Sequence, residues 1–141
     1  MTVSKACTRL VVTAHPEETV QAVAKRMAQY DVGSLIVVDA NKPVGIITDR
    51  DLVLRVMAQD DTSQGLAVRA VMTGNPVCVQ EHMPIEEAIA LMRGYQIRRL
   101  VVVNDAKKLV GILALDDLLL LLGEEQQAVA GLMRMARSRR K

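Results

Sequence analysis

Apolar residues recur at helical spacing in two stretches of the chain, and the second stretch repeats the first. Each has apolar residues at positions i, i+3, i+4 and i+7, which is the stripe of an amphipathic helix. These positions are Val20, Val23, Ala24 and Met27 in the first stretch and Ile85, Ala88, Ile89 and Met92 in the second. A helix is predicted in each stretch, and the repetition indicates a duplicated unit.

Runs rich in β-branched residues flank both predicted helices and predict short strands. One run precedes each helix, and two follow it, joined by a polar turn that closes a hairpin. The runs are LVVTA (10–14), LIVVD (35–39) and PVGIIT (43–48) in the first copy and PVCVQ (76–80), LVVVN (100–104) and LVGILA (109–114) in the second. A further helix is predicted after each hairpin, at about 49–58 and 115–122, and LAVRAVMT (66–73) predicts a short lead-in helix for the second copy.

The order strand–helix–strand–strand–helix, present twice, predicts an α+β fold, an α/β sandwich of two pseudo-symmetric β-α-β-β-α units. The polar segment DDTSQG (60–65) separates the copies. We place the first unit at 7–60, a linker at 61–70, the second unit at 71–123 and a basic C-terminal helix or tail at 124–141. Neither unit buries much surface alone, so the two are expected to pack as one module about a pseudo-twofold axis.

The phrase VGIITDRDL (44–52) contains a residue pattern with two interpretations. Thr48 followed three residues later by Asp51, at the start of an apolar helix, is typical of a capping box. The same groups also suit a nucleotide, since a hydroxyl and free backbone N–H groups can hold a phosphate. The carboxylate can accept hydrogen bonds from two ribose hydroxyls, and Gly45 can allow a ligand or a neighbouring backbone to approach closely.

The second copy of the phrase, VGILALDDL, keeps the acid and loses the hydroxyl. Asp117 matches Asp51, whereas Ala114 replaces Thr48 and Asp116 replaces Arg50. Alanine is a poor helix cap with no hydroxyl, and two adjacent acids repel a phosphate. We therefore expect one good nucleotide cleft and one that is poor, empty or differently loaded.

A second asymmetry lies before the middle strand, where the second copy has Arg98 and Arg99 and the first has Gly33 and Ser34. A pair of guanidinium groups suits a phosphate. The alternative interpretation is two exposed charges at the end of a strand, and the residues alone leave both open.

The ordered set VMTGNPVCV, helix, IRRLVVVN and VGIITDRDL resembles the tandem CBS-domain pair, named after cystathionine β-synthase. The resemblance covers residues 7–123. It implies a disc with two clefts that bind adenosine-containing ligands, in modules that often dimerise and that sense energy state or metabolites without performing chemistry.

The resemblance also implies how the candidate residues combine. Each cleft takes its ribose and phosphate motif from one copy, and its adenine pocket and pre-strand position from the other. The better cleft would consist of Ile47, Thr48, Arg50, Asp51, Val77, Cys78, Val79, Arg98 and Arg99. The weaker cleft would consist of Asp117, Ala114, Ser34, Thr13 and Ala14. Adenine is expected between aliphatic side chains such as Val77 and Ile47, with its edges read by backbone groups.

Composition excludes several other functions. The formal net charge is only +2, and five of the 18 basic residues lie in the last eight positions. The chain has no Phe or Trp and only two Tyr, which argues against stacking-based binding of single-stranded nucleic acid. The longest apolar run, 118–122, is too short to cross a bilayer, and the N-terminus lacks a long apolar run. A cytoplasmic protein with no nucleic-acid or membrane partner is expected.

The reactive side chains do not form a recognisable constellation. Cys7 and Cys78 do not make a disulfide framework, and His15 and His82 have no neighbours at metal-ligand spacing. No set of nucleophile, base and acid is indicated. We therefore predict neither a metal site nor an enzyme.

The functional expectation is a free-standing regulatory module that needs no cofactor, binds AMP, ADP or ATP and modulates an unknown partner protein. One alternative is a sensor of S-adenosylmethionine, whose sulfonium would not need Arg98 and Arg99. Another is a ligand-free scaffold acting through the C-terminal helix. The run DDLLLLLG (116–123) predicts a helix buried on more than one face and a homodimer contact.

Overall fold

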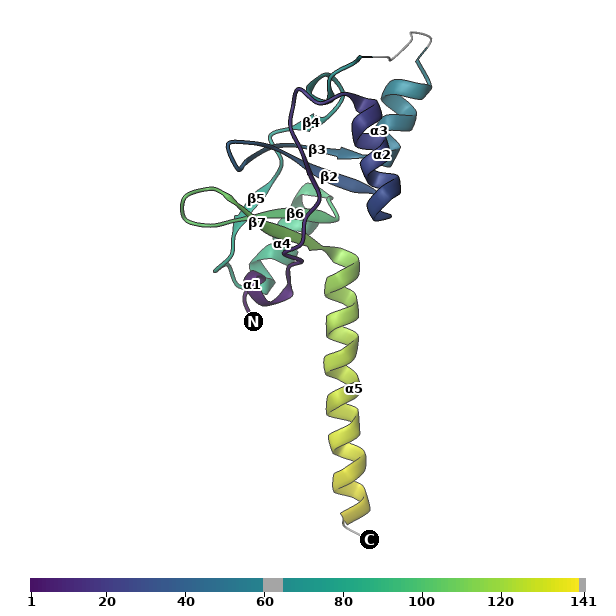
Figure 1. Ribbon diagram of the computed structural model, residues 1–141. Helices are drawn as coiled ribbons and strands as arrows, with labels where there is room; N and C mark the ends of the chain where they lie inside the picture. The colour runs from purple at the N-terminus through teal and green to yellow at the C-terminus, as the bar shows by residue number, and fades with distance from the viewer. Residues whose placement is uncertain (60–64, 140–141) are drawn as a thin grey trace.

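The computed structural model describes residues 1–59 and 65–139, and it confirms the α+β class with a duplicated unit (Figure 1). The first copy contains β1 (Thr13–Ala14), α2 (Val20–Tyr30), β2 (Ser34–Asp39), β3 (Lys42–Thr48) and α3 (Asp49–Leu52), which continues as the π-helical turn η1 (Val53–Met57). The second contains β5 (Cys78–Gln80), α4 (Ile85–Tyr95), β6 (Arg99–Val103), β7 (Leu109–Ala114) and α5 (Leu115–Arg139). The first copy is preceded by α1 (Val3–Ala6). The second copy is preceded by the 3₁₀ turn η2 (Val68–Ala70) and by β4 (Thr73–Gly74).

Each copy forms its own small sheet, and the strand pairing is the same in both. β1 pairs parallel with β2 and β2 antiparallel with β3, and β5, β6 and β7 repeat this arrangement. Even an irregularity in the hairpin is repeated, since the register shifts after Val37 in the first copy and after Val102 in the second. The helices also end alike, because Asp31 and Gln96 both adopt the left-handed conformation that terminates α2 and α4.

The segments that lead into the two copies cross over, so that each completes the sheet of the other copy. β4 pairs antiparallel with β3, with Thr73 opposite Ile46, whereas Thr8 pairs with Ile112 of β7. Two glycines allow the close approach: a β-carbon at Gly45 would lie 3.0 Å from the Thr73 carbonyl oxygen, and one at Gly111 would lie 2.5 Å from that of Thr8. The expected close approach at Gly45 is therefore that of a neighbouring backbone.

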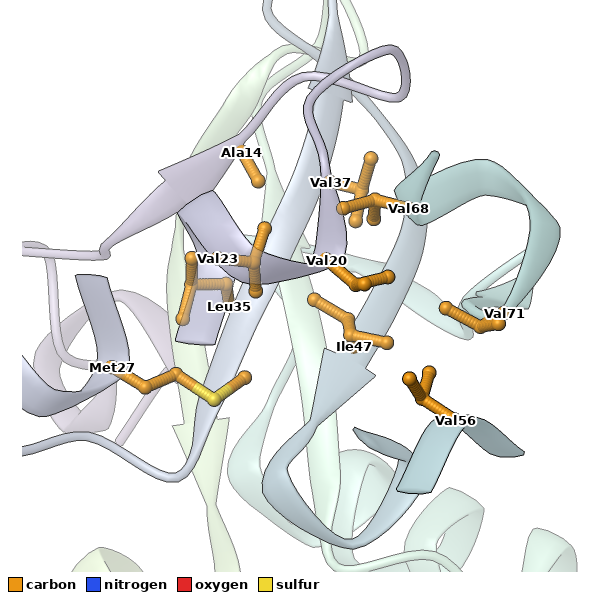
Figure 2. Close-up of a cluster of buried hydrophobic side chains, with 10 residues drawn as sticks. All are labelled: Ala14, Val20, Val23, Met27, Leu35, Val37, Ile47, Val56, Val68 and Val71. Atoms are coloured by element: carbon orange, nitrogen blue, oxygen red, sulfur yellow. The ribbon is translucent and has the colours of Figure 1, made fainter. Parts of the chain in front are cut away.

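The crossing segments also complete the cores. Side chains of α2 face β2 and β3 in the first core, which Val68 and Val71 close from the crossing segment (Figure 2). Val3 takes the corresponding place in the second core and is fully buried. A third cluster, around Ile36 and Val101, lies between the two sheets and joins the copies into one unit. Neither copy therefore has a complete core of its own.

The structure differs from the predicted elements at three places. β1 and β5 contain only two and three residues, because the preceding residues are occupied in crossing from one sheet to the other. α5 is one continuous helix of 25 residues, where a helix ending near 122 and a separate tail helix were expected. The segment at 66–73 leads to the second copy but packs on the first. Residues 60–64 of the predicted linker and residues 140–141 of the tail lie outside the described residues.

Candidate functional site

The turn between β3 and α3 forms the predicted capping box. Thr48 Oγ1 accepts a hydrogen bond from the Asp51 backbone N–H at 3.1 Å, and Asp51 Oδ2 accepts one from the Thr48 N–H at 3.0 Å. The Thr48 hydroxyl keeps its own proton to donate, and the Asp51 carboxylate keeps lone pairs to accept. The cap is therefore compatible with a ligand that brings phosphate oxygens to Thr48 and hydroxyls to Asp51.

The segment leading into the second copy lies beside this turn. Arg55 Nη1 donates to the Val71 carbonyl oxygen at 2.8 Å, and Arg55 Nε lies 3.7 Å from Asp51 Oδ1. From here the chain continues through β4 to β5, where the Val77 carbonyl oxygen accepts from the Val101 N–H at 3.1 Å. The segment that carries Val77 thus connects the sheet of the Thr48–Asp51 turn with the sheet of the second copy.

The corresponding place in the second copy is built from different groups. Ala114 offers no hydroxyl, and Asp117 Oδ2 instead accepts a hydrogen bond from Thr8 Oγ1 at 3.4 Å. Beyond Thr8, the extended residues 9–13 line an open cavity of about 690 Å³ together with Tyr30. Thr13 and Ala14 were both predicted for the weaker cleft. Together they line a second open cavity, of about 820 Å³.

Arg98 and Arg99 lie beside the VGILALDDL motif of their own copy, residues 110–118. Arg98 Nη2 lies 3.3 Å from Asp116 Oδ1, and Arg99 is paired with Ala114 across the strands. Both arginines line a small cavity of about 110 Å³ with the residues that begin α5. In the first copy, Ser34 is likewise paired with Thr48. The resemblance had assigned these pre-strand positions to the opposite copy, whereas the hairpin register places each beside its own.

The predicted adenine contacts are divided between two faces of the sheets. The sequence suggested that the Ile47 side chain contacts adenine. It is instead fully buried in the first core and is not free to do so. Successive strand residues face opposite sides, and Ile46 therefore points to the cluster between the two sheets. Val79 is also buried, in the second core, and only its backbone could contact a ligand. Cys78 is exposed and lines a cavity of about 420 Å³ with Lys42 and Lys107. Arg50 is exposed.

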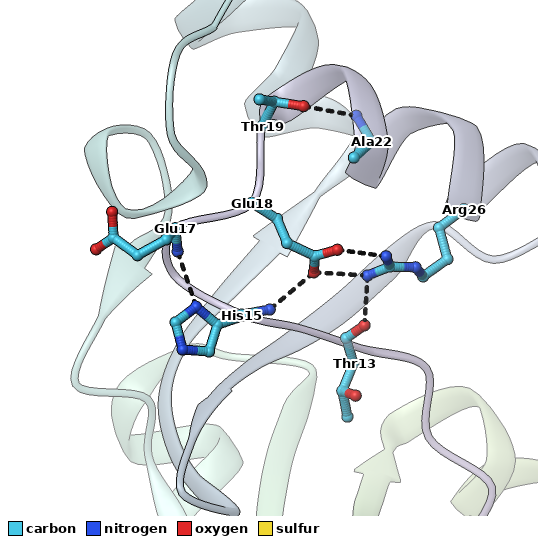
Figure 3. Close-up of polar contacts among 7 residues, drawn as sticks. All are labelled: Thr13, His15, Glu17, Glu18, Thr19, Ala22 and Arg26. Atoms are coloured by element: carbon cyan, nitrogen blue, oxygen red, sulfur yellow. Dashed lines mark hydrogen bonds and ion pairs between the residues drawn. The ribbon is translucent and has the colours of Figure 1, made fainter.

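The sequence reasoning did not find the ion pair between Glu18 and Arg26, whose contacts are drawn in Figure 3. Both side chains line the cavity of about 820 Å³. Arg26 Nη1 donates to Glu18 Oε2 at 2.8 Å and to the Thr13 carbonyl oxygen at 2.9 Å. The hydrogen bonds that Glu18 accepts from Arg26, and then from the His15 N–H, lower its pKa to about 2. The second copy has Met83 and Leu91 at the matching positions. That difference between otherwise equivalent positions is the signal in the sequence that could have revealed the pair.

The remaining reactive groups have ordinary surroundings. Cys7 and Cys78 are free thiols, and partial loss of contact with solvent raises the pKa of each. Within residues 1–59 and 65–139, no three His, Cys, Asp or Glu side chains gather closely enough to hold a metal ion. In the same part of the chain, no helix has the length and hydropathy needed to cross a membrane.

Comparison with known proteins identifies the family. The sequence pattern of the CBS domain matches twice, at residues 3–58 and 68–124. The chain belongs to the CBS-domain family. Each match begins with a crossing segment, so the two CBS domains include the pieces that they exchange.

Relatives and solved structures agree with this tandem CBS pair. The uncharacterized protein MK0525 of Methanopyrus kandleri is 37% identical over 120 residues, which are 84% of this chain and 61% of that protein. The CBS pair of MJ0100, in complex with 5'-methylthioadenosine and S-adenosyl-L-methionine, is 28% identical with a TM-score of 0.76, covering 89% of this chain and 98% of that one. PAE2072 of Pyrobaculum aerophilum, complexed with AMP, is 29% identical with a TM-score of 0.73, covering 83% and 89%.

Proposed function

We propose that this CBS pair is a regulatory module that binds an adenine nucleotide, AMP, ADP or ATP, between its two CBS domains. The observation that carries the proposal is the crossing of the lead-in segments. It joins Asp51, through Arg55, to the segment entering the second copy, and it joins Asp117, through Thr8, to the segment entering the first. Each acid therefore stands at a junction between the two domains, where a ligand contacting both would link them.

The first cleft has the chemistry that a nucleotide requires. The Thr48 hydroxyl can donate to a phosphate, and the Asp51 carboxylate can accept from the two ribose hydroxyls. The backbone N–H groups of Asp49, Arg50 and Asp51 are already hydrogen-bonded, so the free N–H groups expected from the sequence are not available to the phosphate there. The backbone of the segment around Val77 supplies donors and acceptors for the edge of the adenine. Because the capping box already holds Thr48 and Asp51 in place, little ordering is needed when the ligand binds.

The second cleft offers phosphate a different set of groups. Arg98 pairs with Asp116, but both side chains are largely exposed, and a pair of this kind adds little stability. A phosphate could therefore take the place of Asp116 beside Arg98. Without a hydroxyl at Ala114 and with Asp116 beside Asp117, we propose that this cleft binds nucleotide more weakly than the first.

A second candidate ligand is S-adenosylmethionine, favoured by the likeness to MJ0100, whose CBS pair is complexed with it. This ligand shares the adenosine but carries a positive sulfonium in place of phosphates. Asp51 and the backbone contacts would serve both ligands, whereas the Thr48 hydroxyl and Arg98 would favour only a nucleotide.

The proposal includes the biological setting that the sequence indicates. No cofactor is required, the module performs no catalysis, and ligand binding modulates a partner protein whose identity is unknown. We also propose that the chain acts as a homodimer. The cytoplasmic location expected from the sequence stays a prediction.

Thermal unfolding with millimolar AMP, ADP, ATP or S-adenosylmethionine tests the proposal. A ligand at 100 times its dissociation constant should add about 2.7 kcal/mol to the free energy of unfolding. The matched variants are Asp51→Asn and Asp117→Asn, each compared with its own ligand-free midpoint. Asparagine keeps an oxygen that can accept from the Thr48 N–H, but it loses the charge and the second acceptor oxygen.

We expect the nucleotides to raise the midpoint of the unmodified protein and of Asp117→Asn, and to act much less on Asp51→Asn. A response to S-adenosylmethionine alone would favour the second candidate. If none of the four compounds moves the midpoint, the adenosine-sensing function is wrong and the scaffold alternative takes its place.

A further inference from the structure

Arg55 contacts two groups that belong to different parts of the first cleft. Its Nη1 donates to the Val71 carbonyl oxygen at 2.8 Å, and its Nε lies 3.7 Å from Asp51 Oδ1. The other carboxylate oxygen, Asp51 Oδ2, accepts from the Thr48 N–H as part of the capping box. Arg55 therefore faces the carboxylate oxygen that the cap leaves available to a ligand.

The ion pair with Asp51 would mean little by itself. The two residues are four positions apart, and a pair of opposite charges at that spacing on an exposed helix adds little stability. The second contact makes the difference. Val71 lies 16 positions further along the chain, on the segment that crosses between the copies, and its side chain is buried in the first core. The guanidinium is thus held against a buried segment, although the Arg55 side chain is 48% exposed.

The segment that Arg55 contacts leads directly to the residues proposed to contact the base. After Val71 the chain pairs with β3 at Thr73 and Gly74 and then reaches β5 through Val77. The carboxylate for the ribose therefore comes from the first copy, and the backbone for the base comes from the chain that follows Val71. Because a nucleoside spans both groups, the separation between them determines how well it binds.

The second copy has a leucine in place of this arginine. Leu121 stands at the position corresponding to Arg55, within the regular helix α5, whereas Arg55 lies in the π turn η1. Single π turns inside helices often accompany functional sites. Asp117 is joined to its own crossing segment by Thr8, through an exposed hydrogen bond of 3.4 Å. The first copy thus holds its acid through a guanidinium with two contacts, and the second through a single hydroxyl.

We propose that Arg55 is a positioning residue of the first cleft. It aims the available Asp51 oxygen at the ribose, and it fixes the segment after Val71 at the distance that the base requires. This inference rests on the proposed function, since it needs a nucleotide in that cleft. Arginine suits the task because its planar guanidinium can make both contacts at once, whereas a lysine has only one nitrogen to place. A bound nucleotide in turn holds the crossing segment in place through the same contacts.

A direct contact with the phosphate is the other role that an arginine could have beside this turn. The contacts of Arg55 argue against it, because they are with the carboxylate assigned to the ribose and with a backbone carbonyl. The group assigned to the phosphate is the Thr48 hydroxyl. The two roles differ in what a lysine at position 55 can replace, since a phosphate contact needs only the charge.

The first test measures the dissociation constant of AMP by isothermal titration calorimetry on the full-length chain. We expect Arg55→Leu, which introduces the residue of the second copy, to bind AMP about tenfold more weakly than the unmodified chain. Arg55→Lys should bind as weakly, because it keeps the charge but not both contacts. Arg93→Leu, at an exposed position of α4, is the matched control and should leave the constant unchanged. Far-UV circular dichroism and the unfolding midpoint verify that each variant is folded.

Two further measurements separate positioning from a merely structural role. The variant that combines Arg55→Leu with Asp51→Asn should lose clearly less affinity than the product of the two single losses, because Arg55 acts partly through the carboxylate. Hydrogen exchange reports on the crossing segment. Saturating AMP should slow exchange over residues 66–74 in the unmodified chain, and it should do so much less in Arg55→Leu at equal saturation.

The outcomes distinguish this inference from the function on which it rests. If the unmodified chain binds AMP and Arg55→Leu binds it equally well, the role of Arg55 is wrong and the nucleotide site stands. Full affinity in Arg55→Lys, single losses that multiply in the combined variant, or equal slowing of exchange in Arg55→Leu would each overturn the role of Arg55 in the same way. An unmodified chain that does not bind AMP would overturn the proposed function together with this inference.

Discussion

Alanine at position 111 should displace the N-terminal segment from strand β7. A β-carbon at Gly111 would lie 2.5 Å from the carbonyl oxygen of Thr8 and 3.2 Å from Sγ of Cys7. The first contact is with backbone, so rotation of a side chain cannot relieve it. Either β7 or the segment must move, and the two hydrogen bonds that join Thr8 to Ile112, at 2.8 and 2.9 Å, are lost or stretched.

The size of the effect follows from these contacts. Each backbone hydrogen bond contributes about 0.5–1.5 kcal/mol net, so losing both costs about 1–3 kcal/mol. Tolerating the overpacked carbon in place costs a similar about 1–3 kcal/mol. The free energy of unfolding of Gly111→Ala should therefore fall by about 2 kcal/mol. In a chain of this size each 1 kcal/mol moves the unfolding midpoint by about 3 °C, so the midpoint should fall by about 6 °C.

Thermal and urea unfolding followed by circular dichroism measure this, with two other glycines as controls. Gly45→Ala meets the flexible Met72 side chain first, and the Thr73 carbonyl oxygen only at 3.0 Å, so its loss should be smaller. Gly94→Ala has open space around it in α4 and should gain about 0.5–1 kcal/mol. If Gly111→Ala is as stable as Gly94→Ala, the close crossing of the N-terminal segment over β7 is refuted.

Two further predictions follow from the crossing segments and from the half-buried ion pair of Glu18 and Arg26. Val3→Ala and Val68→Ala, which remove equivalent side chains from the second and first cores, should each lower the free energy of unfolding by about 2 kcal/mol in urea titrations; a loss in only one would contradict the exchange. The pKa of Glu18, lowered to about 2 in the folded state, means that its contribution is present above about pH 5 and is lost as the pH falls toward 2. Glu18→Gln should therefore lose stability less steeply than the unmodified protein over that range, by about 1–3 kcal/mol in total, and parallel pH profiles would exclude the Glu18–Arg26 contribution.

The local elements could be predicted because each depends on residues close together in the sequence. The stripe of α2, the hairpin between β2 and β3, and the capping box of Thr48 and Asp51 all involve partners within a few positions. The duplication was equally visible, since the second copy repeats the same spacing of apolar residues. The asymmetry at Ala114 was evident for the same reason: it required only that the two copies be aligned.

Only the tertiary structure decided which copy each segment joins. The two copies present nearly the same strand edges, so residues 3–8 and 68–74 could in principle pair with either, and the sequence does not distinguish these choices. The exchange determines that Thr8 meets Asp117 and that Arg55 meets the Val71 carbonyl. The burial of Ile47 and the partner of Arg98 likewise depend on strand faces and registers, which are set by contacts distant in the sequence. Helical and hairpin structure was thus determined locally by the sequence, whereas the contacts between the two domains form only where distant segments meet.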